Sequence, residues 1–368
     1  MKEKEKGKIQ SVTIENFTCF EKVQLDFSTG INLFIGENGT GKTHVLKAMY
    51  AMLRKNPSFE SIQLTSEKNG QKGLEYGMST ILNFAEVFKD ANCSRDSNDK
   101  YTIDIRFENN EVVNFEFEFK NNSVHEFEAK FLPLQDNPKF LHNLKPLFIP
   151  STEMLSWFKG FVPAYEQREN GFDATFYDLG KALSLLPLRD NVIPNKEEML
   201  ELIEKTTNII VTQVNGEFYV NVKEKDSMAF NASRVASGIN KLAQMIYLIR
   251  NGSLTKDTIL FWDEPEVNLN PKYIRLVADF LMALAKAGVQ IFVATHDYLL
   301  AHYLSTKADY REVTDEPPMK FFAFYKENNA SQVESGESLA EIQNNTLLDE
   351  YAALYDMEGQ LFSESLKK

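Results

Sequence analysis

The sequence has few cysteines and no long apolar segment. Its 368 residues include two cysteines, Cys19 and Cys93, which provide neither a disulfide framework nor a cysteine-based metal cluster. No apolar run is long enough to cross a bilayer, and the N-terminus, rich in lysine and glutamate, lacks the apolar core of a signal peptide. These absences exclude a disulfide-rich secreted domain and a membrane-spanning protein, and they predict a cytoplasmic location without a membrane partner.

Basic residues are also outnumbered. The chain has 40 Lys and Arg against 53 Asp and Glu, a formal net charge of −13. This balance argues against a protein whose whole surface grips nucleic acid, although a local basic strip stays possible. The 28 phenylalanines suffice for a large core, and the length allows one large domain or two. No internal repeat or low-complexity linker divides the chain.

A glycine-rich segment organises the rest of the chain. It follows an apolar stretch at 31–35 that is typical of a buried strand, and it precedes apolar residues at helical spacing over 44–53. A strand, a glycine loop and a helix in this order predict a phosphate-binding loop rather than a chance turn. The segment reads Gly36-Glu37-Asn38-Gly39-Thr40-Gly41-Lys42-Thr43.

The chemistry of such a loop assigns a role to each part. The glycines let backbone N–H groups point at phosphate oxygens, and the helix N-terminus adds a favourable dipole. We expect Lys42 to reach the β- and γ-phosphates of ATP, and the Thr43 hydroxyl to bind Mg²⁺. ATP and Mg²⁺ are therefore the predicted cofactors.

A second apolar strand, at 259–264, ends in two acids. Parallel strands present ligands at their carboxyl edge, so this strand would deliver its carboxylates beside the glycine loop. We expect Asp263 to hold Mg²⁺, directly or through water, and Glu264 to polarise a water molecule against the γ-phosphate. A solvated acidic turn is the alternative, which the glycine loop disfavours.

The remaining pattern predicts a mixed α/β fold. Strands are expected over 9–14, 23–27, 147–149 and 319–325, with an antiparallel meander over 101–132 and a hairpin around Asn215-Gly216. Helices are expected over 42–53, 81–88, 239–249 and 271–286. A strand over 290–294 ends at Thr295-His296-Asp297, which places His296 at the same sheet edge as the glycine loop. His125 is expected to be a structural residue of the meander.

A helical arm is predicted between the two halves of the sheet domain. Ser151 is expected to cap a helix containing Met154, with further helices over 176–186 and 196–205. The aromatic residues of this arm are interpreted as packing rather than as a platform for stacking bases. They are Trp157, Phe158, Phe161 and Tyr165. Near the C-terminus, short helices are expected over 339–342 and 347–354.

These motifs, in this order, resemble the ATPase heads of the ABC, SMC and RecF group, which are AAA-family P-loop ATPases. The greatest likeness is to compact bacterial ATPases related to the overcoming-lysogenisation-defect proteins, as found in anti-phage defence modules. It covers roughly 8–55 and 207–325. It rests on the phosphate loop and on three further segments, Ala236-Ser237-Gly238-Ile239-Asn240-Lys241-Leu242, Leu260-Phe261-Trp262-Asp263-Glu264-Pro265-Glu266-Val267-Asn268-Leu269-Asn270-Pro271 and Ala294-Thr295-His296-Asp297.

The resemblance implies further site residues. Ser237 and Gly238 would form the signature motif that completes an ATP site in the opposing subunit, although an ordinary helix cap is the alternative. The loop 268–270 would carry signals across the dimer, and His296 would be the switch histidine that contacts the γ-phosphate. Relatives often have His where Asn270 stands, and the signature lacks a second glycine. Glu153 occupies about the place of the glutamine loop, an assignment left open.

The resemblance also implies an organisation and a function. Residues 1–150 and 207–368 would form the two parts of the ATPase head, and 151–206 the inserted arm. Many relatives continue into a nuclease domain, whereas only about forty residues follow the last predicted strand here. We therefore expect an ATP-hydrolysing switch that forms homodimers or larger homo-oligomers and controls a separately encoded nuclease or toxin. The alternatives are a DNA-repair or DNA-end-binding ATPase, and a module that binds ATP without hydrolysing it and sequesters an effector.

Overall fold

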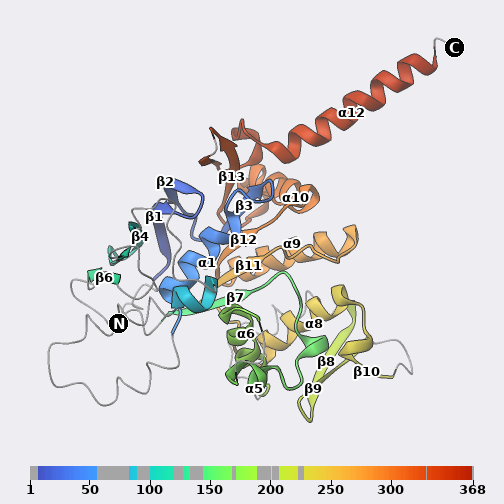
Figure 1. Ribbon diagram of the computed structural model, residues 1–368. Helices are drawn as coiled ribbons and strands as arrows, with labels where there is room; N and C mark the ends of the chain where they lie inside the picture. The colour runs from blue at the N-terminus through green and yellow to red at the C-terminus, as the bar shows by residue number, and fades with distance from the viewer. Residues whose placement is uncertain are drawn as a thin grey trace.

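The structure is a computed structural model, and the described residues surround a central mixed sheet (Figure 1). The described parts of the chain are 7–55, 83–88, 100–119, 127–132, 144–167, 171–188, 200, 207–222, 228–328 and 330–366. The predicted residues His125 and most of 196–205 lie outside them.

The central sheet has six strands, and five of them, from the second strand to the opposite edge, run parallel. β3 and β12 are buried along their whole length, which explains why they read as continuous apolar runs. Only the edge strand β14 pairs antiparallel. The order is β14 (Ala330–Gly336), β13 (Met319–Glu327), β3 (Ile31–Gly36), β12 (Gln290–Ala294), β11 (Thr258–Asp263) and β7 (Lys145–Ile149).

A second sheet of five antiparallel strands contains the predicted meander. Ile103, Ile105 and Phe107 alternate with more exposed residues and are fully buried, so the expected buried face is confirmed for β4. The order is β2 (Phe20–Asp26), β1 (Ile9–Phe17), β4 (Lys100–Phe107), β5 (Val112–Phe119) and β6 (Phe127–Leu132).

A third, small sheet contains the predicted hairpin. Asn215 and Gly216 both have positive φ angles, 52° and 75°, as a tight two-residue hairpin turn requires. The order is β10 (Phe230–Asn231), β9 (Glu217–Val222) and β8 (Ile209–Val214). This hairpin lies with α5, α6 and α8 beside the β7 edge of the central sheet (Figure 1).

The helices cover both faces of the central sheet. The α-helices are α1 (Lys42–Leu53), α5 (Phe161–Glu166), α6 (Ala174–Ser184), α8 (Ser237–Arg250), α9 (Pro271–Lys286), α10 (Tyr298–Asp309), α11 (Arg311–Thr314) and α12 (Thr346–Ser365). Short 3₁₀ turns are Leu155–Trp157, Ala232–Arg234 and Leu339–Glu341. Residues 83–88 are also helical, in agreement with the predicted helix there.

The central sheet separates two apolar cores because alternate side chains point to opposite faces. On one face, Phe34 packs with Phe292 and Phe322 and joins the buried side of α1. On the other, Leu33 and Trp262 join the cluster that contains α8, α9 and α10. The phosphate loop is thus held between two packed layers.

Two expectations about helices are wrong. Ser151 caps no helix: the first helical turn begins after Met154, and the carboxylate of Glu153 accepts the N–H of Ser156 at 3.2 Å. The N-cap residue of this turn is Met154, whose side chain makes no capping hydrogen bond. The short helix expected over 347–354 is instead the 20-residue α12.

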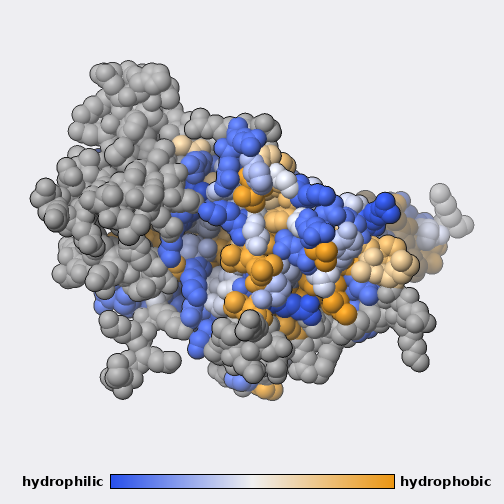
Figure 2. All heavy atoms as spheres, turned by 90° about the horizontal axis from the view of Figure 1, so that it is seen from below, coloured by the Kyte–Doolittle hydropathy of each residue, from blue (hydrophilic) through white to orange (hydrophobic). Residues whose placement is uncertain are grey.

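The described surface mixes polar and apolar groups. Seen from below, hydrophobic residues lie between hydrophilic ones (Figure 2). No helix among the described residues combines the length and apolar character needed to span a membrane.

Candidate functional site

The glycines of the predicted phosphate loop take conformations that other residues adopt at a cost. Gly36, Gly39 and Gly41 have φ angles of 133°, 73° and 97°. A Cβ atom on Gly36 would lie 2.1 Å from the carbonyl oxygen of Phe324, and one on Gly41 would lie 2.4 Å from the ring of Phe20. The loop therefore needs glycine both for its backbone turn and for its packing.

The middle of the loop is held by its own polar groups. Glu37, Asn38 and Gly39 are exposed, whereas the side chain of Thr40 is buried and donates to the carbonyl oxygen of Glu37 at 2.8 Å. The exposed turn leaves the loop backbone accessible from the carboxyl edge of the sheet, where a phosphate group would bind.

Lys42 folds back over the loop that precedes it. Its Nζ donates to the carbonyl oxygens of Gly36 and Glu37 at 2.8 and 2.7 Å. Burial lowers the pKa of Lys42 to about 8, against the opposing effect of the carboxylates of Asp263 and Glu264. The cation is thus held at the loop, where phosphate oxygens would replace the two carbonyls as its partners.

Thr43 and Asp263, the two predicted Mg²⁺ ligands, meet across the sheet edge. Thr43 Oγ1 donates to Asp263 Oδ1 at 2.9 Å. Burial raises the pKa of Asp263 to about 6, although the Thr43 hydrogen bond acts in the opposite direction. A hydroxyl and a carboxylate side by side are the hard oxygen donors that Mg²⁺ prefers, together with water and phosphate oxygens. The donor set fits Mg²⁺ bound with a nucleotide.

Glu264 and His296 also meet at this edge. His296 Nε2 lies 3.2 Å from Glu264 Oε1, and Nδ1 lies 2.9 Å from the carbonyl oxygen of Gly36. Because a carbonyl only accepts, Nδ1 carries a proton, and the Nε2 contact then needs a second proton on either the ring or the carboxyl group. Burial, followed by the charge of Lys42, lowers the pKa of His296.

Glu264 occupies an unusual backbone conformation for a side-chain-bearing residue. Its φ angle is 46°, in the left-handed region. Its N–H still donates to the carbonyl oxygen of Ala294 at 2.8 Å, which continues the β11–β12 pairing by one residue. The turn directs the chain away from the sheet directly after the carboxylate that sequence reasoning assigns to catalysis.

Two further residues complete the site, and sequence reasoning assigned no role to either. Lys241 of α8 is buried and donates to the carbonyl oxygens of Glu264 and Val267 at 3.1 and 3.0 Å. Glu266 Oε1 accepts the N–H of His296 at 3.1 Å. Burial lowers the pKa of Lys241 to about 8 and raises the pKa of Glu266. The one signal for Lys241 was a lysine inside a mostly apolar helix.

The candidate signature residues lie at the start of α8. Ala236 is the N-cap residue and no side chain caps the helix, so the ordinary-cap interpretation of Ser237 is wrong. A Cβ on Gly238 would lie 2.6 Å from the carbonyl oxygen of Asn268, which itself has a φ of 65°. Gly238 is therefore required for close packing of α8 against the loop that follows β11.

Asn270 and Glu153 have structural partners. Asn270 is the N-cap of α9, and its side chain accepts the N–H of Tyr273. Glu153 is buried, and its carboxylate accepts from the Ser156 hydroxyl at 2.6 Å and from Asn240 of α8 at 3.4 Å. These contacts join Glu153 to α8 rather than to Thr43 or Asp263.

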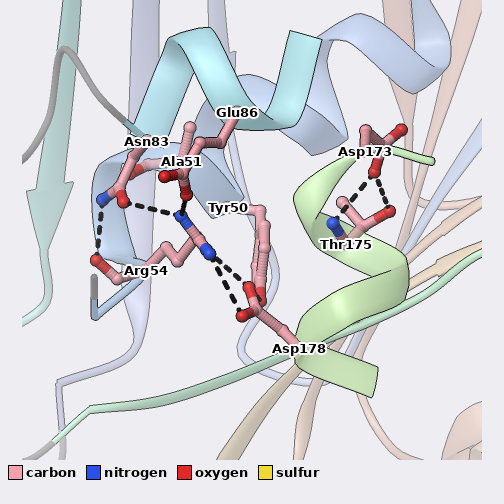
Figure 3. A network of polar contacts seen from close by, with 8 residues as sticks. All are labelled: Tyr50, Ala51, Arg54, Asn83, Glu86, Asp173, Thr175 and Asp178. Carbon is pink, nitrogen blue, oxygen red and sulfur yellow. Dashed lines mark hydrogen bonds and ion pairs between the residues drawn. The ribbon is translucent and has the colours of Figure 1, made fainter. Parts of the chain in front are cut away.

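The C-terminal end of α1 is fixed to the helical arm (Figure 3). Arg54 is buried, and it donates to Asp178 of α6 at 2.5 and 3.2 Å and to Glu86 at 2.5 Å. Tyr50 also donates to Asp178, at 2.7 Å, and Asn83 accepts from Arg54 at 3.0 Å. The helix that carries Lys42 and Thr43 at its start is thus ion-paired to α6 at its end.

Short segments of two curated proteins are similar to this chain. "Structural maintenance of chromosomes protein 6" of Dictyostelium discoideum is 44% identical over 57 residues, 16% of this chain and 5% of that protein. "DNA replication and repair protein RecF" of Clostridioides difficile (strain 630) is 32% identical over 65 residues, 16% of this chain and 18% of that protein. The chain thus matches less than a fifth of the length of these relatives.

A solved structure extends the likeness to nearly the whole chain. The Smc head domain with an extended coiled coil, bound to the C-terminal domain of ScpA and derived from Pyrococcus furiosus, superposes with a TM-score of 0.51. The sequence identity is 12%, and the match covers 91% of this chain and 97% of that chain. The likeness confirms the predicted fold class, an SMC-head-like P-loop NTPase with a mixed sheet.

The model of one protein family matches a segment that contains most of the candidate site residues. It matches residues 31–301, which contain the phosphate loop, the start of α8, the acidic strand and His296. Since the match covers well over half of the chain, the chain belongs to the family described as "AAA domain, putative AbiEii toxin, Type IV TA system".

Proposed function

We propose that this chain is an ATP-hydrolysing switch. The observation that carries the proposal is the convergence of three pairs of groups at the carboxyl edge of β3, β11 and β12. Lys42 meets the loop carbonyls, Thr43 meets Asp263, and His296 meets Glu264. Ligands of open α/β sheets bind at such an edge.

Each pair would serve one part of the reaction. The loop over 36–41 and Lys42 would hold the phosphates, and Thr43 and Asp263 would hold Mg²⁺, which would neutralise phosphate charge. Glu264 would accept a proton from the attacking water, and His296 would bind the γ-phosphate once its contact with Glu264 opens. The 3.2 Å contact supports this exchange because it joins the proton acceptor directly to the phosphate sensor.

The active form would be a dimer of heads around two ATP molecules. Ser237 is only half-buried, at the N-terminus of a 14-residue helix whose N-cap residue, Ala236, makes no side-chain capping hydrogen bond within the described parts of the chain. An anion from an opposing subunit would find both a hydroxyl and a positive helix end there. We propose that Ser237 and Gly238 complete the opposing site, and that the loop 268–270, packed on Gly238, couples the two.

The movement of the heads would control a separately encoded effector, a nuclease or toxin, in bacterial defence against phage. The family description, which names a toxin and a toxin–antitoxin system, supports such a partner. We further propose that 1–150 and 207–368 form one head and 151–206 an arm. The ion pair between Arg54, at the end of α1, and Asp178 supports a mechanical connection between α1 and the arm.

The test is Glu264→Gln. The amide keeps the size of the side chain but cannot accept the proton, so turnover should fall at least about 10²-fold while ATP affinity is kept. The variant should accumulate as an ATP-bound dimer in size-exclusion chromatography with light scattering. Glu108→Gln, at an exposed position in the turn between β4 and β5, is the matched control and should keep wild-type turnover.

The same assay separates the alternatives. Wild-type turnover in the Glu264→Gln variant would assign the base elsewhere, and no turnover in the wild type with intact ATP binding would favour the sequestering module. Turnover that requires added DNA would favour a RecF- or SMC-like repair ATPase. The net charge of −13 makes that last outcome the less expected one.

A further inference from the structure

The helix α12 packs against one core through Leu347 in its first turn and then extends away from it. It is 20 residues long, none of its residues is buried among the described parts of the chain, and it projects away from the sheet (Figure 1). A solvated helix of this length is expected to be polar all round, whereas this one exposes large apolar side chains. They are Leu348, Tyr351, Leu354, Tyr355, Met357, Leu361 and Phe362.

The exposed apolar residues form one stripe. Apart from Met357, they recur three, four or seven residues apart, so they share one face of the helix, about 140° wide at 100° per residue. Tyr355 is 76% exposed and Phe362 is 65% exposed. An apolar stripe of this kind, left in water and interrupted by Glu358, marks a surface that binds another protein.

The charges of α12 define its partner. Between Thr346 and Ser365 there is no Lys or Arg, and there are five acids, Asp349, Glu350, Asp356, Glu358 and Glu364. Glu358 lies inside the apolar stripe, four residues after Leu354 and three before Leu361. A second copy of α12 would therefore bring acids against acids, which disfavours self-pairing.

We propose that the apolar stripe of α12 docks into an apolar groove of a partner protein whose rim is basic and which places a cation opposite Glu358. The helix-in-groove mode needs apolar anchors at this spacing, and opposite charges at the rim add specificity. Burying Glu358 without such a cation would be costly. The inference deepens the proposed function, because it states where the effector binds.

The base of α12 contacts the element that follows the switch histidine. Tyr351 stacks on Tyr298 with ring centroids 4.2 Å apart, and Tyr298 is the first residue of α10, two residues after His296. Tyr298 also stacks on His302 at 5.2 Å. A partner held on the stripe thus lies one ring contact from the start of α10, two residues after His296.

The experiment measures binding of two synthetic helical peptides to the full chain by fluorescence polarisation, without nucleotide. Both have the length and the apolar spacing of α12; one carries lysine on its polar face and the other glutamate. The lysine peptide should bind, more weakly as salt rises, and the glutamate peptide should not. Without nucleotide, a failure here leaves the ATPase proposal untouched.

Matched variants assign the binding to the stripe. Leu354→Glu combined with Phe362→Glu should weaken binding of the lysine peptide at least about tenfold, because both apolar anchors are lost. Ala353→Glu lies about 200° around the helix from Tyr351 and Tyr355. It adds a glutamate on the other face and should not weaken binding of the lysine peptide. All these positions are exposed, so circular dichroism and thermal unfolding should stay at wild-type values.

Three outcomes would overturn the proposal. The first is equal binding of both peptides, and the second is equal loss with Ala353→Glu and with the stripe variant. The third is a nucleotide-free dimer in sedimentation equilibrium that the stripe variant dissociates, because a second copy of the chain would then occupy the stripe.

Discussion

Lys241 of α8 donates two hydrogen bonds, at 3.1 and 3.0 Å, to the carbonyl oxygens of Glu264 and Val267. This buried cation fixes the turn in which Glu264 has a φ of 46°. The backbone of the candidate base is thus held by the same helix that starts with the candidate signature residues. Lys241 is a positioning residue in this arrangement, since its partners are backbone carbonyls.

Lys241→Met should lower the turnover number while ATP affinity stays close to wild type. Methionine keeps the apolar stem but donates nothing, so the Glu264 carboxylate loses its fixed position, and a displacement of about 1 Å can cost about 10²-fold. Phosphate release and nucleotide calorimetry measure the two quantities. Lys272→Met, an exposed lysine at the start of α9, is the control; an unchanged turnover number in Lys241→Met would contradict the positioning role.

Lys42→Ala should weaken ATP binding at least about 30-fold, because hydrogen bonds to charged groups contribute about 1.5–3 kcal/mol each. Isothermal titration calorimetry measures the affinity. Lys47→Ala is the control on the same helix, where Lys47 pairs with Asp173 at 2.7 Å instead of facing the loop. Equal affinities of the wild type and Lys42→Ala would remove Lys42 from the phosphate site.

ATP binding should take up a proton above pH 8. The pKa of Lys42 is about 8 without nucleotide, so at pH 9 the amine is mostly neutral, while the phosphates favour its charged form. Affinity should fall about tenfold per pH unit from pH 8 until the higher pKa of the bound state is reached.

Calorimetry in buffers of different ionisation enthalpy counts these protons: close to none at pH 7 and about one at pH 9. Asp263, with a pKa of about 6, stays ionised over this window. Repeating the count with Lys241→Met tests whether the second buried lysine contributes. A pH-independent affinity would mean that Lys42 stays charged throughout.

Ser237→Arg should leave ATP binding by the separate subunit nearly intact and block association of the heads. A bulky cation at the start of α8 would fill the space that the opposing γ-phosphate needs. Static light scattering with ATP, in the Glu264→Gln background, reads out the dimer. Ser233→Arg, an exposed residue in the turn before α8, is the control. Undiminished ATP-driven association of Ser237→Arg would leave Ser237 without a role between subunits.

The sequence predicted those strands and helices in which burial imposes a recognisable pattern of apolar residues. β3, β11 and β12 are buried on both faces, and their apolar runs were recognisable. α10 was missed although Asp297 caps it, because few of its residues are buried and one of these is the polar Ser305. β14 was missed because its serines, glutamine and glutamate carry little apolar alternation. The length of α12 was underestimated, since Gly359 interrupts its apolar spacing.

The candidate site was predictable where side chains act through their own chemistry. The loop glycines, Thr43, Asp263, Glu264 and His296 form patterns that the reaction itself demands. Lys241 and Glu266 act on backbone groups of Glu264, Val267 and His296, and any sequence supplies backbone groups at those positions. Such partners leave no pattern, so only the folded chain reveals them.

The ion pair of Arg54 with Asp178 implies a two-way relation between the arm and the nucleotide. If ATP shifts α1, the pair transmits the shift to α6, and linkage then requires that whatever binds the arm changes the affinity for ATP by the same factor. A molecule that binds the ATP-loaded arm about tenfold more tightly must itself raise ATP affinity about tenfold. In the proposed switch, a molecule bound to the arm would therefore change the affinity for ATP as well as respond to ATP binding.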